Sequence, residues 1–180
     1  MDLFAPYGPF DSFENYQEWL KTTRSGDDPL FHAIVTENSQ KAIGVASFLR
    51  TQSDIGVLEV GHIHFSPLLQ KTPVATEAMF LMMSRVFDEL GYRRYEWKCD
   101  ALNTPSRKAA QRLGFIYEGT FRQATIYKNR NRDTAWFAIL DKDWPSLKKT
   151  FQTWLNPENF DANDQQKLSL KEIRNNQEKI

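Results

Sequence analysis

The sequence has a single cysteine, Cys99, among its 180 residues, so no disulfide can form within the chain. It has no apolar run approaching the roughly 20 residues that a membrane-spanning helix requires. Its N-terminus shows neither the basic stretch nor the apolar stretch of a secretory signal peptide. These absences lead us to expect a soluble, cytoplasmic protein that is held together by its hydrophobic core.

The chain also lacks an excess of charge of either sign, because 23 Lys and Arg residues balance 23 Asp and Glu residues. A partner held mainly by bulk electrostatics, such as nucleic acid or an anionic membrane, is therefore not expected. Aromatic side chains are abundant, with 13 Phe, 6 Tyr and 5 Trp. They supply core material for a single domain, since a chain of this length buries roughly 70% of the surface that its unfolded form exposes.

A predicted strand that runs into the start of a predicted helix dominates the middle of the chain. Apolar residues favour the strand over residues 58–65. Thr72 suits the N-cap of the helix, because its hydroxyl can accept a backbone N–H, and Pro73 suits the first helical position. Apolar residues at helical spacing continue the helix as far as Gly91, which favours a left-handed end.

The start of this helix is a candidate anion site. The first N–H groups of a helix have no partner within it and lie at the positive end of its dipole. We expect free N–H groups that could hold a pyrophosphate at Lys71, Thr72, Val74 and Ala75. The Lys71 ammonium would add a positive charge at the same place.

The rest of the chain alternates predicted helices and strands. A helix is expected from Ser12, its N-cap, to Leu20, followed by a hairpin that turns at 37–39. Another helix is expected over 103–114, with Thr104 as its N-cap. The remaining predictions are strands at 31–35, 41–50, 94–99, 117–127 and 134–140, a polar turn at 128–133, a helix at 144–155 and a weakly ordered polar tail at 156–180. This order indicates an α/β or α+β domain with a mixed sheet.

Two motifs resemble the GNAT superfamily of N-acetyltransferases. The segment 70–78 is similar to the loop that binds the pyrophosphate of coenzyme A, with the pattern Gln or Arg, two residues, Gly, one residue, and Gly or Ala. Gln70 and Ala75 match this pattern, whereas Pro73 replaces its first glycine. The second motif, in the following predicted helix, consists of Asn103, Ser106 and Leu113-Gly114-Phe115. The resemblance covers roughly residues 30–142 and is closest to the ribosomal-protein N-terminal acetyltransferase subgroup.

This resemblance implies a GNAT fold, a mixed and mostly antiparallel sheet splayed at its centre with flanking helices, and acetyl-coenzyme A (acetyl-CoA) lying in the wedge. Backbone groups of His64 and Phe65 would pair with the pantetheine arm, and the loop 70–75 would hold the pyrophosphate. Asn103 would hydrogen-bond the pantetheine arm, and Ser106 would donate a proton to the departing thiolate. Alternatively, Asn103 and Ser106 only satisfy backbone groups at the start of their helix.

Two positions depart from the proton-handling side chains that the resemblance implies. Ala110 stands where many members carry a tyrosine acid, and Thr125 stands where the subgroup carries a glutamate base. Glu59, on the central strand, and Tyr127, after the strand that carries Thr125, are the expected replacements in catalysis.

An α-amino group or a small-molecule amine is the expected acceptor. Deprotonation at pH 7 costs about 1.4 kcal/mol for an α-amino group, against about 4.6 kcal/mol for a lysine side chain. We therefore expect direct transfer of an acetyl group from acetyl-CoA to a peptide N-terminus or a small amine. The alternative is a catalytically degenerate GNAT-fold module that binds coenzyme A or a protein partner.

The expected organisation has three parts: an N-terminal helical segment at 1–30, a GNAT acetyltransferase domain at 31–155 and the polar tail at 156–180. The N-terminal segment is shorter than the resemblance implies. It would leave the acceptor side open, or a second copy of the chain in a homodimer would close it.

The three histidines do not predict a metal site. His62 and His64 project from the same side of the central strand, but two histidines without a nearby third ligand are usually core or cleft residues, and His32 lies in another strand. Cys99 could act as a nucleophile through a covalent intermediate. Direct transfer is expected instead, because a lone buried cysteine normally behaves as a small hydrophobe.

Overall fold

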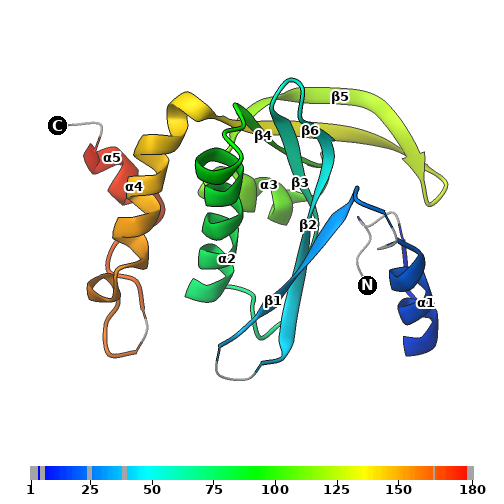
Figure 1. The fold of residues 1–180 in the computed structure, drawn as a ribbon, viewed down its shortest axis with the longest axis horizontal. Coiled ribbons are helices and arrows are strands. Elements are labelled where there is room, and N and C mark those ends of the chain that lie inside the picture. The colour runs from blue at the N-terminus through cyan, green and yellow to red at the C-terminus, as the bar shows by residue number, and fades with distance from the viewer. Residues whose placement is uncertain (1–3, 5–6, 24–25, 38–39, 164, 178–180) are drawn as a thin grey trace.

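The protein is built on a six-stranded sheet with the order β1-β2-β3-β4-β6-β5. The computed structural model describes residues 4, 7–23, 26–37, 40–163 and 165–177 (Figure 1). The strands are β1 (Leu30–Val35), β2 (Ala42–Gln52), β3 (Val57–Phe65), β4 (Arg94–Asp100), β5 (Ile116–Tyr127) and β6 (Arg130–Leu140). β3 and β4 pair in parallel, and the other neighbouring strands of the sheet pair in antiparallel. This arrangement confirms the predicted mixed, mostly antiparallel sheet.

The sheet opens between its two central strands. The last pair between β3 and β4 in the described chain is Val60 opposite Trp97. β3 nevertheless runs on to Phe65, still paired with β2, and β4 runs on to Asp100. The register between β2 and β3 shifts at a bulge next to His62, whose φ is 48°. The predicted splay at the centre of the sheet is confirmed.

Helices cover both faces of the sheet. They are α1 (Phe13–Thr23), α2 (Pro73–Ser84), a π-helical turn at Arg85–Glu89, α3 (Thr104–Arg112), α4 (Trp144–Leu155), α5 (Leu170–Gln177) and short 3-10 turns at Asp141–Asp143 and Pro157–Asn159. Figure 1 shows α1 on one side of the sheet and α2, α4 and α5 on the other. None of the helices in the described part of the chain has both the length and the apolar character needed to cross a membrane.

The main core fills the layer between the sheet and the helices α2 to α5. Its fully buried large side chains come from strands and helices alike and include Tyr95, Phe137, Phe151, Leu58, Met79, Met83 and Ile139. α1 contributes no buried residue. It packs instead through aromatic rings, because the Trp19 ring centroid lies 4.3 Å from that of Tyr7 and 6.2 Å from that of Phe31.

The helix caps agree only in part with the sequence predictions. The Thr72 hydroxyl accepts the Ala75 N–H at 3.3 Å, so α2 begins as predicted. The cap of α3 is Asn103 rather than Thr104, because the Asn103 side-chain oxygen accepts the Ser106 N–H at 3.1 Å. Asparagine and threonine are both good N-caps, and here the helix begins one residue earlier than a cap at Thr104 predicted.

The two hairpins test the predicted turns. In the first, residues 38 and 39 of the predicted turn lie outside the described residues. In the second, the turn consists of Lys128 and Asn129 alone, so the predicted turn at 128–133 was too long. Both residues take a positive φ, 49° and 57°, which allows a tight two-residue turn that continues the strand twist. β6 therefore starts at Arg130, earlier than predicted.

The prediction of a weakly ordered tail was wrong. α5 places Leu170 and Ile173 in the main core, where they are 1% and 4% exposed. The asparagines of this segment also satisfy the backbone, since the Asn159 side-chain amide donates to the carbonyls of Trp154 and Leu168, each at 3.1 Å. Two apolar anchors and these hydrogen bonds order a segment whose composition alone suggests disorder. The predicted boundaries at residues 30 and 155 stay predictions.

We expect Leu170→Ala to lower the free energy of unfolding by about 2–5 kcal/mol, because it removes a fully buried side chain and leaves a cavity. Leu168→Ala is the control, since that side chain is 42% exposed and its loss should change stability by about 0.5 kcal/mol or less. Urea unfolding followed by tryptophan fluorescence measures both. Equal losses for the two variants would mean that α5 is not anchored in the core.

Candidate active site

The splayed ends of β3 and β4 enclose a cleft of about 200 Å³. It extends over the bulged half of β3, the end of β4 and the first turn of α3. The described side chains that line it include Tyr7, Glu59, His62, His64, Trp97, Cys99, Asp100, Asn103, Ser106 and Arg132. The structure brings Glu59, His64, Asn103 and Ser106 of the predicted site residues together in this cleft, and Tyr7 and Asp100, which the sequence did not single out, line it as well.

Two imidazoles and a phenol meet on the side of the cleft that α1 covers. The Tyr7 hydroxyl lies 3.2 Å from His62 Nδ1 and 3.0 Å from His64 Nε2. The two histidines thus project from the same side of β3, as predicted. Burial lowers the pKa of His62, and the charges of His64 and Arg50 act in the same direction. The neutral imidazole of His62, which can accept a proton, is therefore favoured at neutral pH.

The third histidine lies apart from this pair. The His32 ring packs edge-on against Phe48, at 4.9 Å between centroids, whereas Phe31, its neighbour in β1, packs against His62. Since neighbouring residues of a strand point to opposite faces, His32 lies on the other face of the sheet. No group of three or more His, Cys, Asp or Glu side chains that could hold a metal ion occurs among the described residues.

Glu59 lies in the cleft but is already engaged by two cations. Arg50 Nη1 donates to both of its carboxylate oxygens, at 2.7 Å and 2.6 Å, and Lys98 Nζ lies 2.8 Å from Oε2. The side chain is only 5% exposed. Lys98 Nζ also pairs with a Glu96 carboxylate oxygen at 2.7 Å. Arg50, Glu59, Lys98 and Glu96 therefore form one network of charges across β2, β3 and β4.

Tyr127 is bound to an acid rather than aimed into the cleft. Its hydroxyl donates to Asp100 Oδ2 at 2.6 Å, and Arg130 pairs with the same carboxylate oxygen. Burial, together with the hydrogen bond and charge of Asp100, raises the pKa of Tyr127 to about 12. Burial also acts to raise the pKa of Asp100, but hydrogen bonds from Tyr127, Leu102 and Arg130 outweigh it and lower that pKa overall. Asp100 lines the cleft, and Tyr127 is not among the described residues that do so.

Asn103 and Ser106 serve the helix start and line the cleft at once. The Asn103 side-chain oxygen caps α3. This is the role that the alternative interpretation of the sequence gave it, to satisfy a backbone group at the start of the helix. Ser106 Oγ accepts the indole N–H of Trp97 at 3.0 Å. A hydroxyl that accepts a hydrogen bond still has its own proton to donate. The Trp97 contact therefore orients Ser106 and leaves its proton for a second partner, which in this structure is the neighbouring Cys99 sulfur.

Cys99 lies beneath the same part of the cleft. It is 6% exposed and belongs to the main core. Burial raises the pKa of its thiol, and a hydrogen bond with Ser106 and the charges of Arg132 and Arg107 oppose this only in part. A thiol with a raised pKa is a poor nucleophile at neutral pH, so the environment is that of a structural cysteine.

The loop between β3 and α2 is more self-contained than predicted. The Thr72 N–H donates to the Leu69 carbonyl at 3.3 Å, and the Ala75 N–H donates to the Thr72 hydroxyl. Two of the four N–H groups that were expected to be free are therefore engaged within the loop. The Gln70 side chain donates to the Phe65 carbonyl at 2.7 Å, and Lys71 takes a positive φ of 63°. These contacts hold the loop against the unpaired end of β3.

The positions that depart from the usual proton-handling pattern lie outside the cleft. Ala110 is fully buried in the main core, and Thr125 is exposed on β5. Neither is among the described residues that line the cleft. Tyr7 carried no sequence signal, because its contact with His62 joins residues 55 positions apart. Asp100 had no distinct signal either, because it continues the alternation of polar and apolar residues in β4.

Comparison with known proteins agrees with this geometry. The sequence profile described as the acetyltransferase (GNAT) domain matches residues 4–116. A solved GCN5-related N-acetyltransferase from Brucella melitensis is 48% identical, with a TM-score of 0.93 over 96% of this chain and 78% of that chain. A solved structure from Chromobacterium violaceum, described as an acetyltransferase of the GNAT family, is 43% identical, with a TM-score of 0.76 over 79% of this chain and 71% of that chain.

Among curated proteins, the uncharacterized N-acetyltransferase YnaD of Bacillus subtilis (strain 168) is 29% identical over 141 residues, which are 78% of this chain and 81% of that protein. These matches do not separate the ribosomal-protein subgroup from others, so that finer assignment stays a prediction. The profile match covers more than half of the chain, and the splayed six-stranded sheet is the one found in the solved relatives. The chain belongs to the GNAT family of acetyltransferases.

Proposed function

We propose that the protein transfers an acetyl group from acetyl-CoA directly to a primary amine. The observation that carries this proposal is the interrupted pairing of β3 and β4 beyond Val60 and Trp97. The backbone of an unpaired strand end can hydrogen-bond an extended ligand as a neighbouring strand would. The amide-containing pantetheine arm of coenzyme A is such a ligand, and GNAT enzymes use acetyl-CoA as their cosubstrate.

The residues present fit this cosubstrate, with specific roles for the loop. The strand end at His64 and Phe65 would pair with the pantetheine arm, and the N–H groups of Lys71 and Val74 would face the pyrophosphate. Gln70, Thr72 and Ala75 would act mainly by shaping the loop, as their contacts within it indicate. Asn103 would complete the site from the start of α3.

Ser106 is the proposed acid. In direct transfer the amine nitrogen forms a bond to the thioester carbonyl carbon, the carbon–sulfur bond breaks, and the sulfur leaves as a thiolate. Ser106 lies in the cleft with its Oγ fixed by the Trp97 indole, so its proton can pass to that sulfur. No covalent intermediate on the protein is needed.

His64, coupled to His62 through Tyr7, is the proposed base in place of Glu59 or Tyr127. A neutral imidazole has one ring nitrogen that can take the proton that the amine loses. Glu59 remains a second candidate, but Arg50 and Lys98 already engage its carboxylate. Tyr127, also proposed from the sequence, donates its proton to Asp100 and has a pKa of about 12, which disfavours it as a base at neutral pH.

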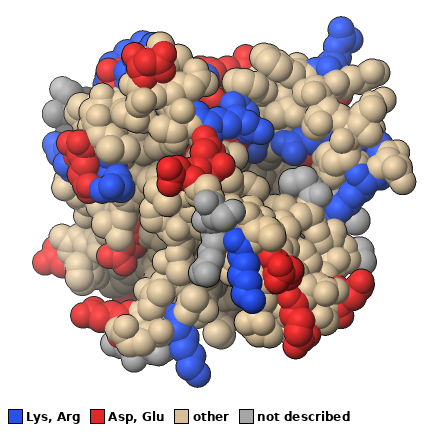
Figure 2. All heavy atoms as spheres, turned by 45° about the vertical axis from the view of Figure 1, so that its right-hand side comes forward, with Lys and Arg blue, Asp and Glu red and all other residues tan. Residues whose placement is uncertain are grey.

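The acceptor would be an α-amino group or a small-molecule amine in the cytoplasm, and an α-amino group is cheaper to deprotonate than a lysine side chain. Figure 2 shows acidic and basic side chains interspersed over the face that it draws, which gives no strong field to attract a polycationic tail there. The mixed charge of this face is compatible with a peptide N-terminus, as in the ribosomal-protein subgroup, and with a free amine alike.

Acetyl-CoA should bind with a sub-millimolar dissociation constant in calorimetry, and Ala75→Glu should abolish binding, because it places a carboxylate beside a phosphate site. Leu81→Glu is the control, since Leu81 lies on the same helix and is 59% exposed. Absence of binding to the unmodified protein would refute the proposed cosubstrate. Binding without turnover on any amine would favour the catalytically degenerate module.

The pH dependence of kcat/KM tests the proposed base. The rate should rise with pH, because only the deprotonated form of the base can accept a proton from the amine. His64→Gln should lower the rate at pH 7 by about 10²-fold and move the rising limb to higher pH, where the amine supplies its own free base. His32→Gln, on the other face of the sheet, should leave the profile unchanged. An unchanged profile in His64→Gln, with a loss in Glu59→Gln, would assign the base to Glu59.

Direct transfer predicts that Cys99→Ala keeps most of the turnover, within about threefold, because the cysteine is buried and its thiol has a raised pKa. Steady-state rates and the unfolding midpoint of the variant are measured together. Loss of turnover in a folded variant, with acetylated Cys99 found by mass spectrometry in the unmodified protein, would overturn the direct mechanism.

A further inference from the structure

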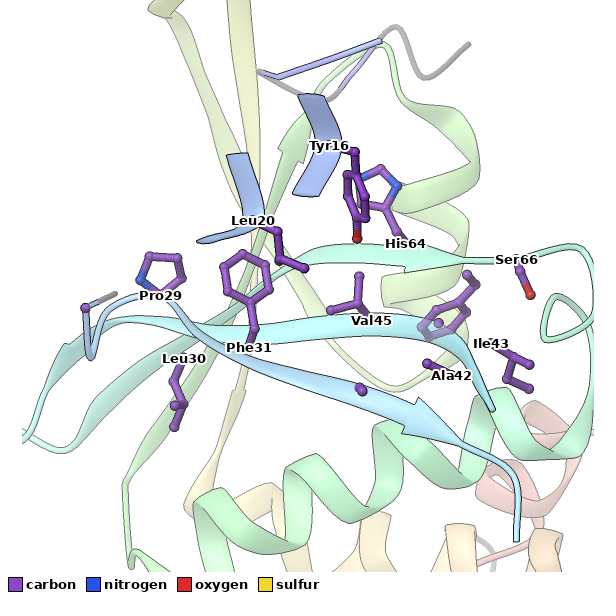
Figure 3. A pocket seen from close by; sticks show the side chains of 14 residues that line it. Tyr16, Leu20, Pro29, Leu30, Phe31, Ala42, Ile43, Val45, His64 and Ser66 are labelled. Carbon is purple, nitrogen blue, oxygen red and sulfur yellow. The ribbon is translucent and has the colours of Figure 1, made fainter. Parts of the chain in front are cut away.

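A second and larger cavity opens on the α1 side of the sheet. Its volume is about 670 Å³, within the roughly 300–1,000 Å³ that is typical of small-molecule pockets. Figure 3 shows Tyr16 and Leu20 of α1 facing Phe31, Val45 and His64 of the strands across this space. The pocket therefore lies between the helix and the sheet, outside the main core.

The floor of the pocket is one row of side chains across three strands. Ala33 in β1 pairs with Val45 in β2, and Val45 pairs with His64 in β3. Residues paired in this way point to the same face of the sheet. Small and branched apolar side chains therefore lead along the floor to a single imidazole.

The described lining of this pocket contains no Lys, Arg, Asp or Glu. Its side-chain polar groups are His64 and the hydroxyls of Tyr16 and Ser66. A charged group of a ligand would lose its hydration there without gaining an ionic partner, which is costly. An apolar group would instead gain about 25 cal/mol for each Å² of surface removed from water.

His64 connects the pocket with the cleft, because its side chain lines both. The Tyr7 hydroxyl, 3.0 Å from His64 Nε2, lies on the cleft side of this imidazole. A molecule whose amine is placed at His64 for acetylation has two directions in which to extend. One is the cleft that the proposed function assigns to the thioester, and the other is the apolar pocket.

We propose that the acceptor is a primary amine whose substituent is apolar, aromatic or branched aliphatic, and that this substituent occupies the pocket between α1 and the sheet. This inference rests on the proposed acetyl transfer and adds the class of acceptor. A polyamine or a lysine-rich peptide would place a second positive charge in a pocket whose described lining offers no carboxylate.

A panel of amines at pH 8 tests the proposal, with 2-phenylethylamine, 3-methylbutylamine, a peptide beginning with phenylalanine, spermidine and an N-blocked lysine peptide. The expected result is a kcat/KM at least about 10-fold higher for the apolar amines than for spermidine or the lysine peptide. Equal or faster turnover of spermidine or the lysine peptide would overturn the proposal.

Two variants locate the selectivity. Ala33→Asp puts a carboxylate on the floor of the pocket, at an exposed position that should tolerate it. It should lower kcat/KM for 2-phenylethylamine by about 10-fold or more, and it should reduce the ratio of kcat/KM for 2-phenylethylamine to kcat/KM for spermidine. Val35→Asp is the matched control, because Val35 lies two residues further along the same strand, is 45% exposed and does not line the pocket. Equal effects of the two variants would place the substituent elsewhere.

Calorimetry with 2-phenylethylamine and without acetyl-CoA separates the two proposals. Binding that Ala33→Asp weakens and Val35→Asp does not would support the pocket assignment even if no amine were acetylated, in which case the proposed transfer alone would fail. Turnover of some amine without any preference for apolar substituents would refute the pocket assignment and leave the proposed transfer intact.

Discussion

The early end of hydrogen bonding between β3 and β4 is the constraint on which the site depends. β3 and β4 pair over four residues and then diverge. Beyond that point β3 stays paired with β2, and its register shifts at a bulge next to His62. The N–H and C=O groups on the freed edge then need water or a ligand, since unpaired polar backbone is costly once buried. The same divergence opens the cleft, which His64 lines from β3 and Ser106 lines from α3.

Ion pairing decides which side chains around the opening can handle protons. Glu59 and Glu96 share Lys98, and Asp100 is paired with Arg130 and hydrogen-bonded by Tyr127. A buried carboxylate without a cationic partner would destabilise the fold, so the loss of one partner from any of these pairs would be costly in free energy. These contacts also engage Glu59 and Tyr127, the two residues that the sequence analysis expected to handle protons. The imidazoles beside Tyr7 are then the groups in the cleft best suited to accept a proton.

Local sequence signals predicted the elements well, because caps, glycine ends and apolar periodicity act over a few residues. The bounds of α4 and the Thr72 cap of α2 were both predicted correctly. The predictions that failed depend on contacts between distant segments, or on a choice between two similar residues for one position. Asn103 and Thr104 are both good caps, and only the backbone decides between them. The order of the tail depends on burial of Leu170 in a core assembled elsewhere, and composition cannot show this.

The two sides of the site are anchored very differently, and this bears on how specificity can change. The side proposed for acetyl-CoA consists of β3, α2 and α3, which contribute residues to the main core. The side proposed for the acceptor is covered by α1, which has no buried residue and is held by the Trp19 contacts with Tyr7 and Phe31. An element with few buried contacts opens and varies at lower cost than the core does. Substitutions along α1 can therefore reshape the pocket for the acceptor while the splayed strands that would hold acetyl-CoA keep their geometry.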